Sequence, residues 1–316
     1  MRVIYEKLPS KRKKCVATIG AFDGVHLGHK FILKRVKNKA LKRGIYSLVI
    51  TFDIHPRKLL SKKFLTSDKA FLGHIADHRQ KKNLIKSLGI NCIWFLKTHH
   101  SFLKLSGRDF LEYVLRHFDI CELIVGEDFR FGYRGEADVS YLDKVSKFYN
   151  FNLTVIKKIK KTKVAISSSL IRRMIRDGEF KKVRTFLGRN YYLEGKVIRG
   201  VGIGKQLGFP TANIHVFDYI LPKRGVYAAY IDTLKKRYLC GVNIGTRPTI
   251  TTSQKEVVEA HIINFKKNIL GKIVRIHFLE KIRGEKEFSS NTRLKNVIND
   301  DINYIHKRYR IPKNAL

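Results

Sequence analysis

The chain contains few cysteines and no long apolar run. Its 316 residues include four cysteines, Cys15, Cys92, Cys121 and Cys240. Their wide separation argues against a disulfide framework or a metal cluster and predicts reduced, buried thiols in a cytoplasmic protein. No stretch approaches the roughly 18 to 20 apolar residues of a membrane span, so no membrane partner is expected. The basic residues 1–14 are not followed by an apolar h-region of the length that signal peptides have, which argues against a secretory signal.

Acidic residues are scarce relative to basic ones. The sequence has 26 Asp and Glu against 65 Lys and Arg, a formal net charge of +39 at pH 7. Such a balance is typical of nucleic-acid-binding proteins. The lysines are, however, spread over almost every helix-like segment, and Asn, Ile, Lys and Phe are all abundant, as expected from an AT-rich coding genome. We therefore expect nonspecific retention on polyanions and no specific nucleic-acid partner, with functional polyanion binding as the alternative.

Length and patterning predict two domains. The chain is 44% hydrophobic and 29% charged, and 316 residues provide room for two cores. Up to about Gly188, apolar runs alternate with helix-like segments, which predicts a parallel sheet covered by helices, with ligands at the carboxyl ends of its strands. Short β-rich runs then predict an antiparallel sheet or small barrel and a C-terminal helix. The predicted fold class is α/β plus all-β, with domains at 1–187 and 188–316.

Hydrophobic periodicity predicts the individual strands and helices of both domains. In the first domain, strands are expected at about 15–19, 46–52, 92–96, 122–125 and 153–156, and helices at about 28–43, 70–88, 107–117, 138–149, 167–178 and 179–187. The segment from 53 to about 68 is predicted to be a loop. In the second domain, strands are expected at about 191–198, 226–231, 239–244, 257–263 and 273–279, and a helix at about 288–309.

The stretch 17–30 joins a predicted buried strand to a predicted helix through a glycine-rich turn. It reads A-T-I-G-A-F-D-G-V-H-L-G-H-K. This arrangement aims backbone N–H groups and a positive helix end at a ligand above the strand. Gly28 leaves room for close approach, and His26 and His29 can both donate to one anionic group, so a phosphate fits best. Surface or capping histidines are the bland alternative, and a zinc site is less favoured because no cysteine or acidic partner stands at ligand spacing.

Polar residues follow four strand-like segments of the first domain. The groups are His26 and His29, Asp53 and His55, Asp128 and Arg130, and Ser167–Arg172. Each group alone is typical of a turn, an ion pair or a helix cap. Their joint occurrence at successive strand ends predicts one site.

The stretch Gly200 to Asn213 reads G-V-G-I-G-K-Q-L-G-F-P-T-A-N. It matches neither a phosphate-binding P-loop nor a dinucleotide-binding fingerprint. A flexible glycine loop is one interpretation. The Thr211 hydroxyl and the Asn213 amide stand two residues apart, however, so on an extended chain both point to one face and could share a Mg²⁺ ion with ATP phosphates.

These motifs resemble those of one family, in order along the chain. G-A-F-D-G-V-H-L-G-H resembles the first signature of the HxGH nucleotidylyltransferases, in particular the FMN adenylyltransferase half of prokaryotic FAD synthetases. V-G-E-D-F-R-F-G and I-S-S-S-L-I-R resemble later signatures of that half, and L-G-F-P-T-A-N resembles the motif of riboflavin kinases. Four positions depart from the family pattern: Ser169 stands where threonine is usual, Lys205 where many members have arginine, Ile54 where proline is usual, and Leu270 where tyrosine is usual.

The resemblance implies a bifunctional riboflavin kinase/FMN adenylyltransferase. The first domain would be Rossmann-like and the second a small antiparallel β-barrel with a C-terminal helix. Riboflavin and ATP would give FMN, and FMN and ATP would give FAD and pyrophosphate, with Mg²⁺ as cofactor. The expected partners are these small molecules, and the expected state is a monomer or weak homo-oligomer.

The resemblance also implies three sets of site residues. The catalytic set is His26, His29 and Glu259, with Glu259 as the general base, although unaided it would be a solvent-facing strand residue. The set for ATP and its phosphates is Gly20, Phe22, Asp23, Gly28, Ser168, Ser169, Arg172, Gly202, Gly204, Lys205, Gly208, Thr211 and Asn213, of which Thr211 and Asn213 would also bind the metal. The flavin set is Asp53, His55, Asp128, Phe129, Arg130, Tyr227, Asn243 and Arg283.

Three alternatives stay open at this point. A monofunctional enzyme with one decayed site is supported only by Ile54 and Leu270. A class I tRNA synthetase-like protein would share the HxGH motif, but it would need a Lys-Met-Ser-Lys-Ser-type loop, which the sequence lacks. A nucleic-acid-binding module is supported by charge alone.

Overall fold

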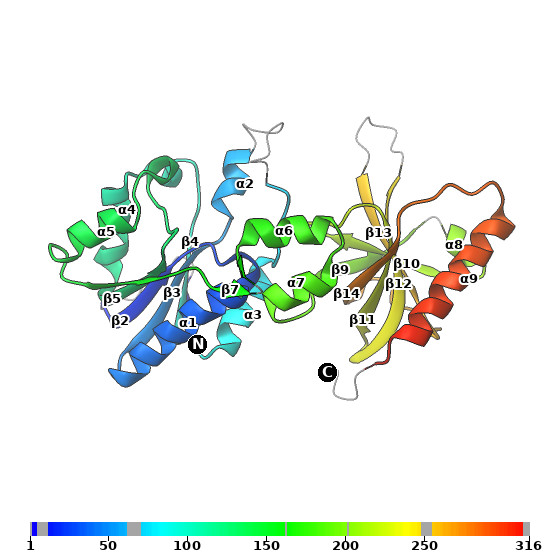
Figure 1. Cartoon of the computed structure of the whole chain (residues 1–316), viewed down its shortest axis with the longest axis horizontal. Coiled ribbons are helices and arrows are strands. Elements are labelled where there is room, and N and C mark those ends of the chain that lie inside the picture. Colours follow the sequence, from blue (N-terminus) through cyan, green and yellow to red (C-terminus); the bar gives the residue numbers. More distant parts are fainter. Residues whose placement is uncertain are drawn as a thin grey trace. The chain divides into compact units, whose positions relative to one another are not determined.

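The computed structural model describes residues 2–4, 12–61, 71–161, 163–200, 202–247 and 255–311. The packing of Cα atoms divides the chain into two compact units, Met1–Ser168 and Ser169–Leu316 (Figure 1). Helices α6 (Ser168–Arg176) and α7 (Phe180–Leu187) lie between this border and the predicted one. The domain border at 187/188 therefore stays a prediction.

The first unit is built on six parallel strands in the order β1-β4-β3-β2-β5-β6. The strands are β1 (Arg2–Ile4), β2 (Lys14–Ile19), β3 (Tyr46–Phe52), β4 (Cys92–Leu96), β5 (Asp119–Gly126) and β6 (Asn152–Ile156). The helices are α1 (Leu27–Lys42), α2 (Pro56–Ser61), α3 (His78–Ser87), α4 (Gly107–His117) and α5 (Val139–Ser146). Single turns η1 (Asp23–Val25), η2 (Phe102–Lys104) and η3 (Tyr133–Gly135) and a small hairpin of β7 (Lys160–Lys161) and β8 (Val164–Ala165) complete the unit.

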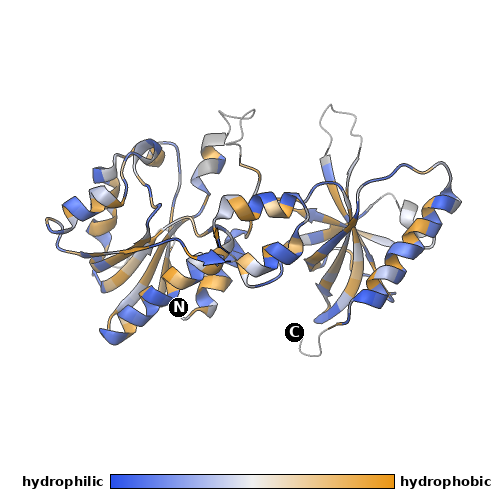
Figure 2. Ribbon diagram, in the orientation of Figure 1, coloured by the Kyte–Doolittle hydropathy of each residue, from blue (hydrophilic) through white to orange (hydrophobic). Residues whose placement is uncertain are grey.

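Helices cover both faces of this sheet. Successive side chains of a strand point to opposite faces, and on these strands the residues of both faces are apolar, so both faces must be covered. Ala17 and Leu48 belong to one buried cluster, which α4 and α5 complete. Val16 and Val49 belong to the other, which α1 and α3 complete. Figure 2 shows the strands as largely hydrophobic and the helices as striped. The predicted parallel sheet with helices is thus confirmed.

Two sequence predictions for the first unit were wrong in part. The segment expected to be a loop after residue 53 contains the short helix α2. The helix expected at 70–88 begins only at His78, behind the N-cap Asp77. The physical reason lies in the preceding residues, because the backbone N–H groups of Ile75 and Ala76 donate to the Asp23 carboxylate. Residue 70 lies outside the described residues.

The second unit contains a closed barrel of six antiparallel strands in the order β10-β13-β12-β11-β14-β9. They are β9 (Tyr192–Ile198), β10 (Thr211–Val216), β11 (Gly225–Thr233), β12 (Lys236–Arg247), β13 (Lys255–Ile262) and β14 (Ile273–Arg283). The helical turn α8 (Ile203–Gln206) precedes β10, and α9 (Asn291–Arg308) follows β14. The barrel and its C-terminal helix are confirmed, whereas β10 was missing from the predicted strands.

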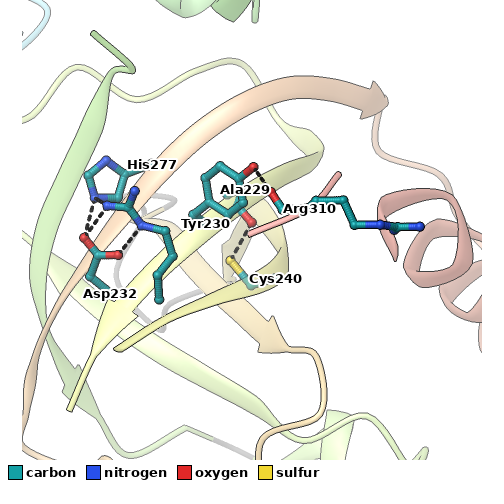
Figure 3. Close-up of polar contacts among 7 residues, drawn as sticks. Ala229, Tyr230, Asp232, Cys240, His277 and Arg310 are labelled. Atoms are coloured by element: carbon teal, nitrogen blue, oxygen red, sulfur yellow. Dashed lines mark hydrogen bonds and ion pairs between the residues drawn. The ribbon is translucent and has the colours of Figure 1, made fainter. Parts of the chain in front are cut away.

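Apolar side chains fill the barrel and also cover part of its outer face. Tyr227, Ile231 and Phe278 are fully or almost fully buried. On the outer face, α9 buries Ile305 against Ala228, Tyr230 and Leu239. The hydroxyl of Tyr230 donates to the carbonyl of Arg310, which ties down the chain beyond α9 (Figure 3).

The cysteines of the chain carry free thiols. All four are unpaired, and three of them are buried. Among the described residues, no helix combines the length and apolar character needed to cross a membrane.

Two candidate active sites

The first candidate site lies where the order of the parallel strands reverses. Strand β2 pairs with β3 on one side and with β5 on the other, and the chain continues outward in both directions. In such sheets, ligands bind at the carboxyl ends of the strands at this switch point. The turn after β2 carries the histidine motif, and the turn after β5 carries Asp128.

The turn between β2 and α1 has an unusual backbone. Phe22 and Val25 have φ angles of 46° and 41°, in the left-handed region that side chains with a Cβ rarely adopt. The ring of Phe22 packs over Gly20, where an added Cβ would come 3.2 Å from the ring. Strained backbone of this kind persists where the surroundings hold it and is concentrated at functional sites.

The two histidines of this turn form a stacked pair. Their ring centroids lie 3.5 Å apart with an angle of 17° between the planes. The backbone N–H of His29 donates to Nδ1 of His26 at 3.2 Å, so the geometry assigns the neutral His26 proton to Nε2. Gly28 lies in the first turn of α1, and a Cβ there would come 3.2 Å from the His26 ring. The pair is therefore packed against a helix N-terminus.

The surroundings of His29 favour its neutral form. Its burial lowers its pKa well below the usual value, and the charges of His26 and Lys81 lower it further. Its Nδ1 is buried and has no hydrogen-bond partner among the described residues. A neutral imidazole with an unused ring nitrogen is suited to donate to, or accept from, a bound ligand.

Asp23 and Ser168 have structural contacts at the same turn. The Asp23 carboxylate is buried and accepts from the backbone N–H groups of Ile75 and Ala76 at 3.1 and 3.3 Å. The Ser168 hydroxyl donates to the Asp23 carbonyl at 3.1 Å. These contacts join the segment before α3 and the start of α6 to the histidine turn. Ser169 and the buried Arg172 follow on α6 in the second unit.

The predicted flavin residues of the first unit differ in exposure. Asp53 accepts from the backbone N–H of Thr98 at 2.8 Å, which ties the ends of β3 and β4 together. His55 is buried, with its ring centroid 5.2 Å from that of Phe71. Asp128 is exposed and forms an ion pair with Lys158 at 3.2 Å. Phe129 stacks on Phe131 with centroids 5.3 Å apart, and the Arg130 guanidinium donates to the Gly135 carbonyl at 3.3 Å.

Sequence reasoning missed Lys81. This lysine of α3 is only 4% exposed, and its Nζ lies 3.3 Å from the carbonyl of Phe52 at the end of β3. A signal was available, because Lys81 stands four residues before the buried Ile85 and so falls on the inward stripe of the helix.

The second candidate site is a row of polar residues on the outer face of the barrel. Asn213 of β10 pairs in register with Glu259 of β13, which pairs in register with Asn243 of β12. Side chains of such pairs share a face and lie about 4.5–5.5 Å apart at Cβ. The alternate residues, such as Val258 and Ala260, are buried in the barrel. The prediction that Thr211 and Asn213 share a face agrees with their positions on β10.

The glycine loop is packed against this row. A Cβ at Gly200 would lie 1.9 Å from Nδ2 of Asn213, and one at Gly204 would lie 2.6 Å from the carbonyl of Phe209. Gly202 and Gly208 have φ angles of 86° and 89°, which the turns on either side of α8 require. Val201 and the side chain of Lys205 lie outside the described residues.

The donor set of this row fits a hard divalent cation. Thr211 offers a hydroxyl and Asn213 an amide oxygen, and Glu259 adds a carboxylate one strand away. Mg²⁺ prefers such oxygen ligands and typically takes one or two from the protein and the rest from phosphates and water. Among the described residues, no group of three or more His, Cys, Asp and Glu forms an all-protein metal cage.

The other predicted flavin residues of the second unit lie in different surroundings. The Arg283 guanidinium pairs with the Asp301 carboxylate of α9 at 2.9 and 3.0 Å. Tyr227 is fully buried and donates its hydroxyl to the carbonyl of Lys223, so its described contacts are those of a core residue. Two of the departures from the family pattern are exposed, Ile54 at 36% and Leu270 at 51%, which gives neither a large packing role.

A doubly wound sheet with paired imidazoles at its switch point, followed by a barrel with a polar row beside a glycine loop, defines a two-domain transferase acting on phosphates. Residues 8–170 match the FAD synthetase family, and residues 187–309 match the riboflavin kinase family. The chain belongs to the family of bifunctional riboflavin kinase/FMN adenylyltransferases.

Two relatives and one solved structure show the extent of the likeness. The bifunctional riboflavin kinase/FMN adenylyltransferase of Buchnera aphidicola subsp. Acyrthosiphon pisum is 33% identical over 302 residues, 95% of each chain. The one of Escherichia coli K12 is 31% identical over 303 residues, again 95% of each chain. A crystal structure described as a macrolide-efflux protein from Streptococcus pneumoniae has a TM-score of 0.84 at 22% identity and covers 98% of this chain and 100% of its own. That last likeness concerns the fold alone.

Proposed function

We propose that the chain performs two reactions in two separate sites, one built on the parallel sheet and one on the barrel. As a member of its family, it phosphorylates riboflavin with ATP to give FMN and adenylylates FMN with ATP to give FAD and pyrophosphate. The observation that carries the assignment of sites is the row Asn213–Glu259–Asn243 beside the glycine loop. A carboxylate flanked by two amides beside a glycine loop provides a base and metal ligands in one place.

In the kinase site, Glu259 acts as the general base. The 5′-oxygen of riboflavin attacks the γ-phosphorus of ATP, the bond to the β,γ-bridging oxygen breaks, and ADP leaves. Glu259 takes the proton from the attacking hydroxyl. Thr211 and Asn213 would hold Mg²⁺, which supplies charge neutralisation at the ATP phosphates when bound. We assign Gly202, Gly204, Lys205 and Gly208 to the phosphates, and Asn243 and Arg283 to the flavin side.

In the adenylylation site, the chain acts by alignment and charge neutralisation. A phosphate oxygen of FMN attacks the α-phosphorus of ATP, and pyrophosphate leaves with the electron pair of the broken bond. His26 and His29 donate to the α-phosphate at the N-terminus of α1. Gly20, Phe22 and Gly28 shape this turn, and Asp23 holds it in place. The remaining assignments are Ser168, Ser169 and Arg172 to the β- and γ-phosphates, and Asp53, His55, Asp128, Phe129 and Arg130 to the flavin or nucleotide.

One experiment with two variants tests the separation of sites. The full chain is incubated with riboflavin, ATP and Mg²⁺, and the flavins are separated by chromatography over time. E259Q is expected to abolish FMN formation but to form FAD from supplied FMN. H29A is expected to lower FAD formation by about two orders of magnitude or more while FMN still accumulates. Loss of both activities in either folded variant contradicts separate sites, and an active E259Q ends the assignment of the base.

Two further expectations concern the cofactor and the assembly. Omission of Mg²⁺ is expected to stop both reactions, because each moves a phosphorus centre of ATP. We also propose that the chain acts as a monomer or weak homo-oligomer, since each site draws its assigned residues from one chain. Sedimentation velocity over a range of protein concentrations would test this state.

A further inference from the structure

Lys81 is a buried lysine without a carboxylate partner among the described residues. It is 4% exposed, and its Nζ lies 3.3 Å from the carbonyl of Phe52 and 3.5 Å from Oγ1 of Thr51. An ammonium has three donors, and both contacts are longer than ordinary hydrogen bonds. Lysines are almost never buried unless they are paired, because the charge loses its hydration. These two contacts therefore do not compensate for the free energy lost when the ammonium is removed from water.

The position of Lys81 is fixed relative to the histidine turn. Its Nζ lies at the carboxyl end of β3, and the neighbouring Thr51 hydroxyl donates to the carbonyl of Ala21 in the turn at 3.2 Å. The segment before α3 is anchored from the other side, because Ile75 and Ala76 donate to Asp23. Helix α3 is therefore linked to the turn that carries His26 and His29 in two ways, through Lys81 and Thr51 and through the segment before its first residue.

The charge of Lys81 acts on one imidazole of the pair, that of His29. It contributes, after burial and the charge of His26, to lowering the pKa of His29. Burial lowers the pKa of Lys81 itself to about 8, against the opposing charges of Asp23 and Asp53. The group is thus still mainly protonated at neutral pH. The Lys81 ammonium contacts Thr51, whose hydroxyl contacts the histidine turn, and the group that would complete a cation beside two imidazoles is an anion.

We propose that Lys81 is a further substrate-binding residue of the adenylylation site, where its ammonium donates to an anionic phosphate oxygen of the bound nucleotide beside His29. This inference rests on the proposed role of the imidazole pair. Negative charge moves onto the departing pyrophosphate as the bond to the α-phosphorus breaks. A cation already fixed in a buried site stabilises that charge without reorganisation. The alternative is a purely structural lysine that only contacts the last carbonyl of β3.

The reverse reaction isolates this site. FAD and pyrophosphate give ATP and FMN through the adenylylation site alone, since the kinase site does not act on FAD. K81M removes the charge and keeps the length of the side chain. We expect it to raise the KM for pyrophosphate about tenfold or more and to lower kcat about a hundredfold. The matched control K86M changes an exposed lysine of the same helix and is expected to leave both constants unchanged.

Three comparisons make the outcome decisive. K81M with wild-type constants overturns the proposal. K81R keeps the charge on a longer side chain and should stay within severalfold of the wild-type KM, so equal losses in K81R and K81M indicate packing and also overturn it. H29A is measured in parallel: an active H29A means that the proposed site is wrong, whereas an inactive H29A beside an active K81M rejects Lys81 alone. The circular dichroism spectrum and thermal transition of each variant are compared with those of the wild type, because riboflavin phosphorylation takes place in the barrel unit and does not report the folding of the unit that contains Lys81.

Discussion

Gly200 lies so close to Asn213 that a Cβ at position 200 would come 1.9 Å from Nδ2 of the amide and 2.5 Å from its Cγ. The Asn213 side chain therefore depends on the absence of a side chain at Gly200. We expect G200A to displace the amide and to lower riboflavin phosphorylation at least about tenfold, since a site misplaced by about 1 Å loses that much or more. The measurement is the initial rate of FMN formation over a range of Mg²⁺ and ATP concentrations.

The other reaction is the internal control for this variant. FAD formation from supplied FMN uses the adenylylation site, to which Gly200 is not assigned, and should stay at the wild-type rate. Wild-type kinase activity in G200A would show that Asn213 can move without consequence. Its assignment to the metal would then be wrong.

His261 of β13 contacts the residues that directly precede the neighbouring strand β10. Its Nδ1 lies 3.0 Å from the carbonyl of Pro210, which can only accept, so the ring donates there. Its ring meets that of Phe209 edge to face at 5.6 Å, and the residue pairs in register with Thr211. We expect H261A to raise the KM for ATP in riboflavin phosphorylation about five- to tenfold, the worth of about one hydrogen bond. The kcat should change less.

H261N is the conservative partner for this test. Its side-chain amide retains an N–H donor for the Pro210 carbonyl, so part of the lost affinity should return. A KM equal to that of H261A would show that the ring contact with Phe209, rather than the hydrogen bond, positions the strand.

Acid stability of the barrel depends on a cluster at the hairpin of β11 and β12. Asp232 accepts from Arg237 at 2.6 and 2.8 Å and from His277 at 2.8 Å (Figure 3). Burial alone would raise the pKa of Asp232, but the Arg237 and His277 hydrogen bonds outweigh it and lower the pKa to about 2. Since the folded pKa lies below the unfolded one, this carboxylate stabilises the fold above about pH 4. The contribution, about 2 kcal/mol, is lost as pH falls towards 2.

Comparison of the wild type with D232N isolates this contribution from other carboxylates. The difference in free energy of unfolding between the two chains, measured by denaturant titration, should be largest near neutral pH and shrink between about pH 4 and 2. A difference in the free energy of unfolding that stays constant across this pH range would mean that protonation of Asp232 does not change the stability of the fold.

The sequence predicted those elements whose own residues decide their structure. Helix α4 matches its predicted range 107–117 because an amphipathic pattern follows the N-cap Ser106, whose side chain accepts from the backbone N–H of Asp109. Strands β3 and β4 match theirs because each is a continuous apolar run bounded by polar residues. Strand β10 was missed because Thr211–Val216 is short and mixed in polarity. It becomes a strand by pairing with β9 and β13 on both sides.

The sites were predictable as motifs but not as arrangements. The histidine turn and the Thr-Ala-Asn segment were found because their residues are adjacent in sequence. The row that joins Asn213 to Glu259 and Asn243 depends on strand register between distant segments, which no local pattern contains. Lys81 was missed for a different reason. A lysine on a polar helix is ordinarily solvent-exposed, whereas the tertiary packing of α3 buries this one at the end of β3.

Loss of the Lys81 proton should limit FAD formation at alkaline pH. The groups around it are His29, His78, Asp23 and Asp53, and burial lowers its pKa to about 8. The site is charged below that pH and neutral above it, so kcat/KM for adenylylation of FMN should fall as pH rises through about 8. K81R should retain activity to higher pH, because arginine stays protonated.

The burial of Lys81 predicts that removal of its charge increases the stability of the fold, although it lowers activity. The folded pKa of Lys81 lies about 2.5 units below its usual value, so keeping the charge buried at neutral pH costs on the order of 3 kcal/mol. K81M should therefore unfold at a higher denaturant concentration than the wild type, most clearly below pH 8, while it forms FAD more slowly. A variant that is both less stable and less active would show that Lys81 serves the fold of α3, whereas a more stable and inactive one identifies a charge retained for the substrate.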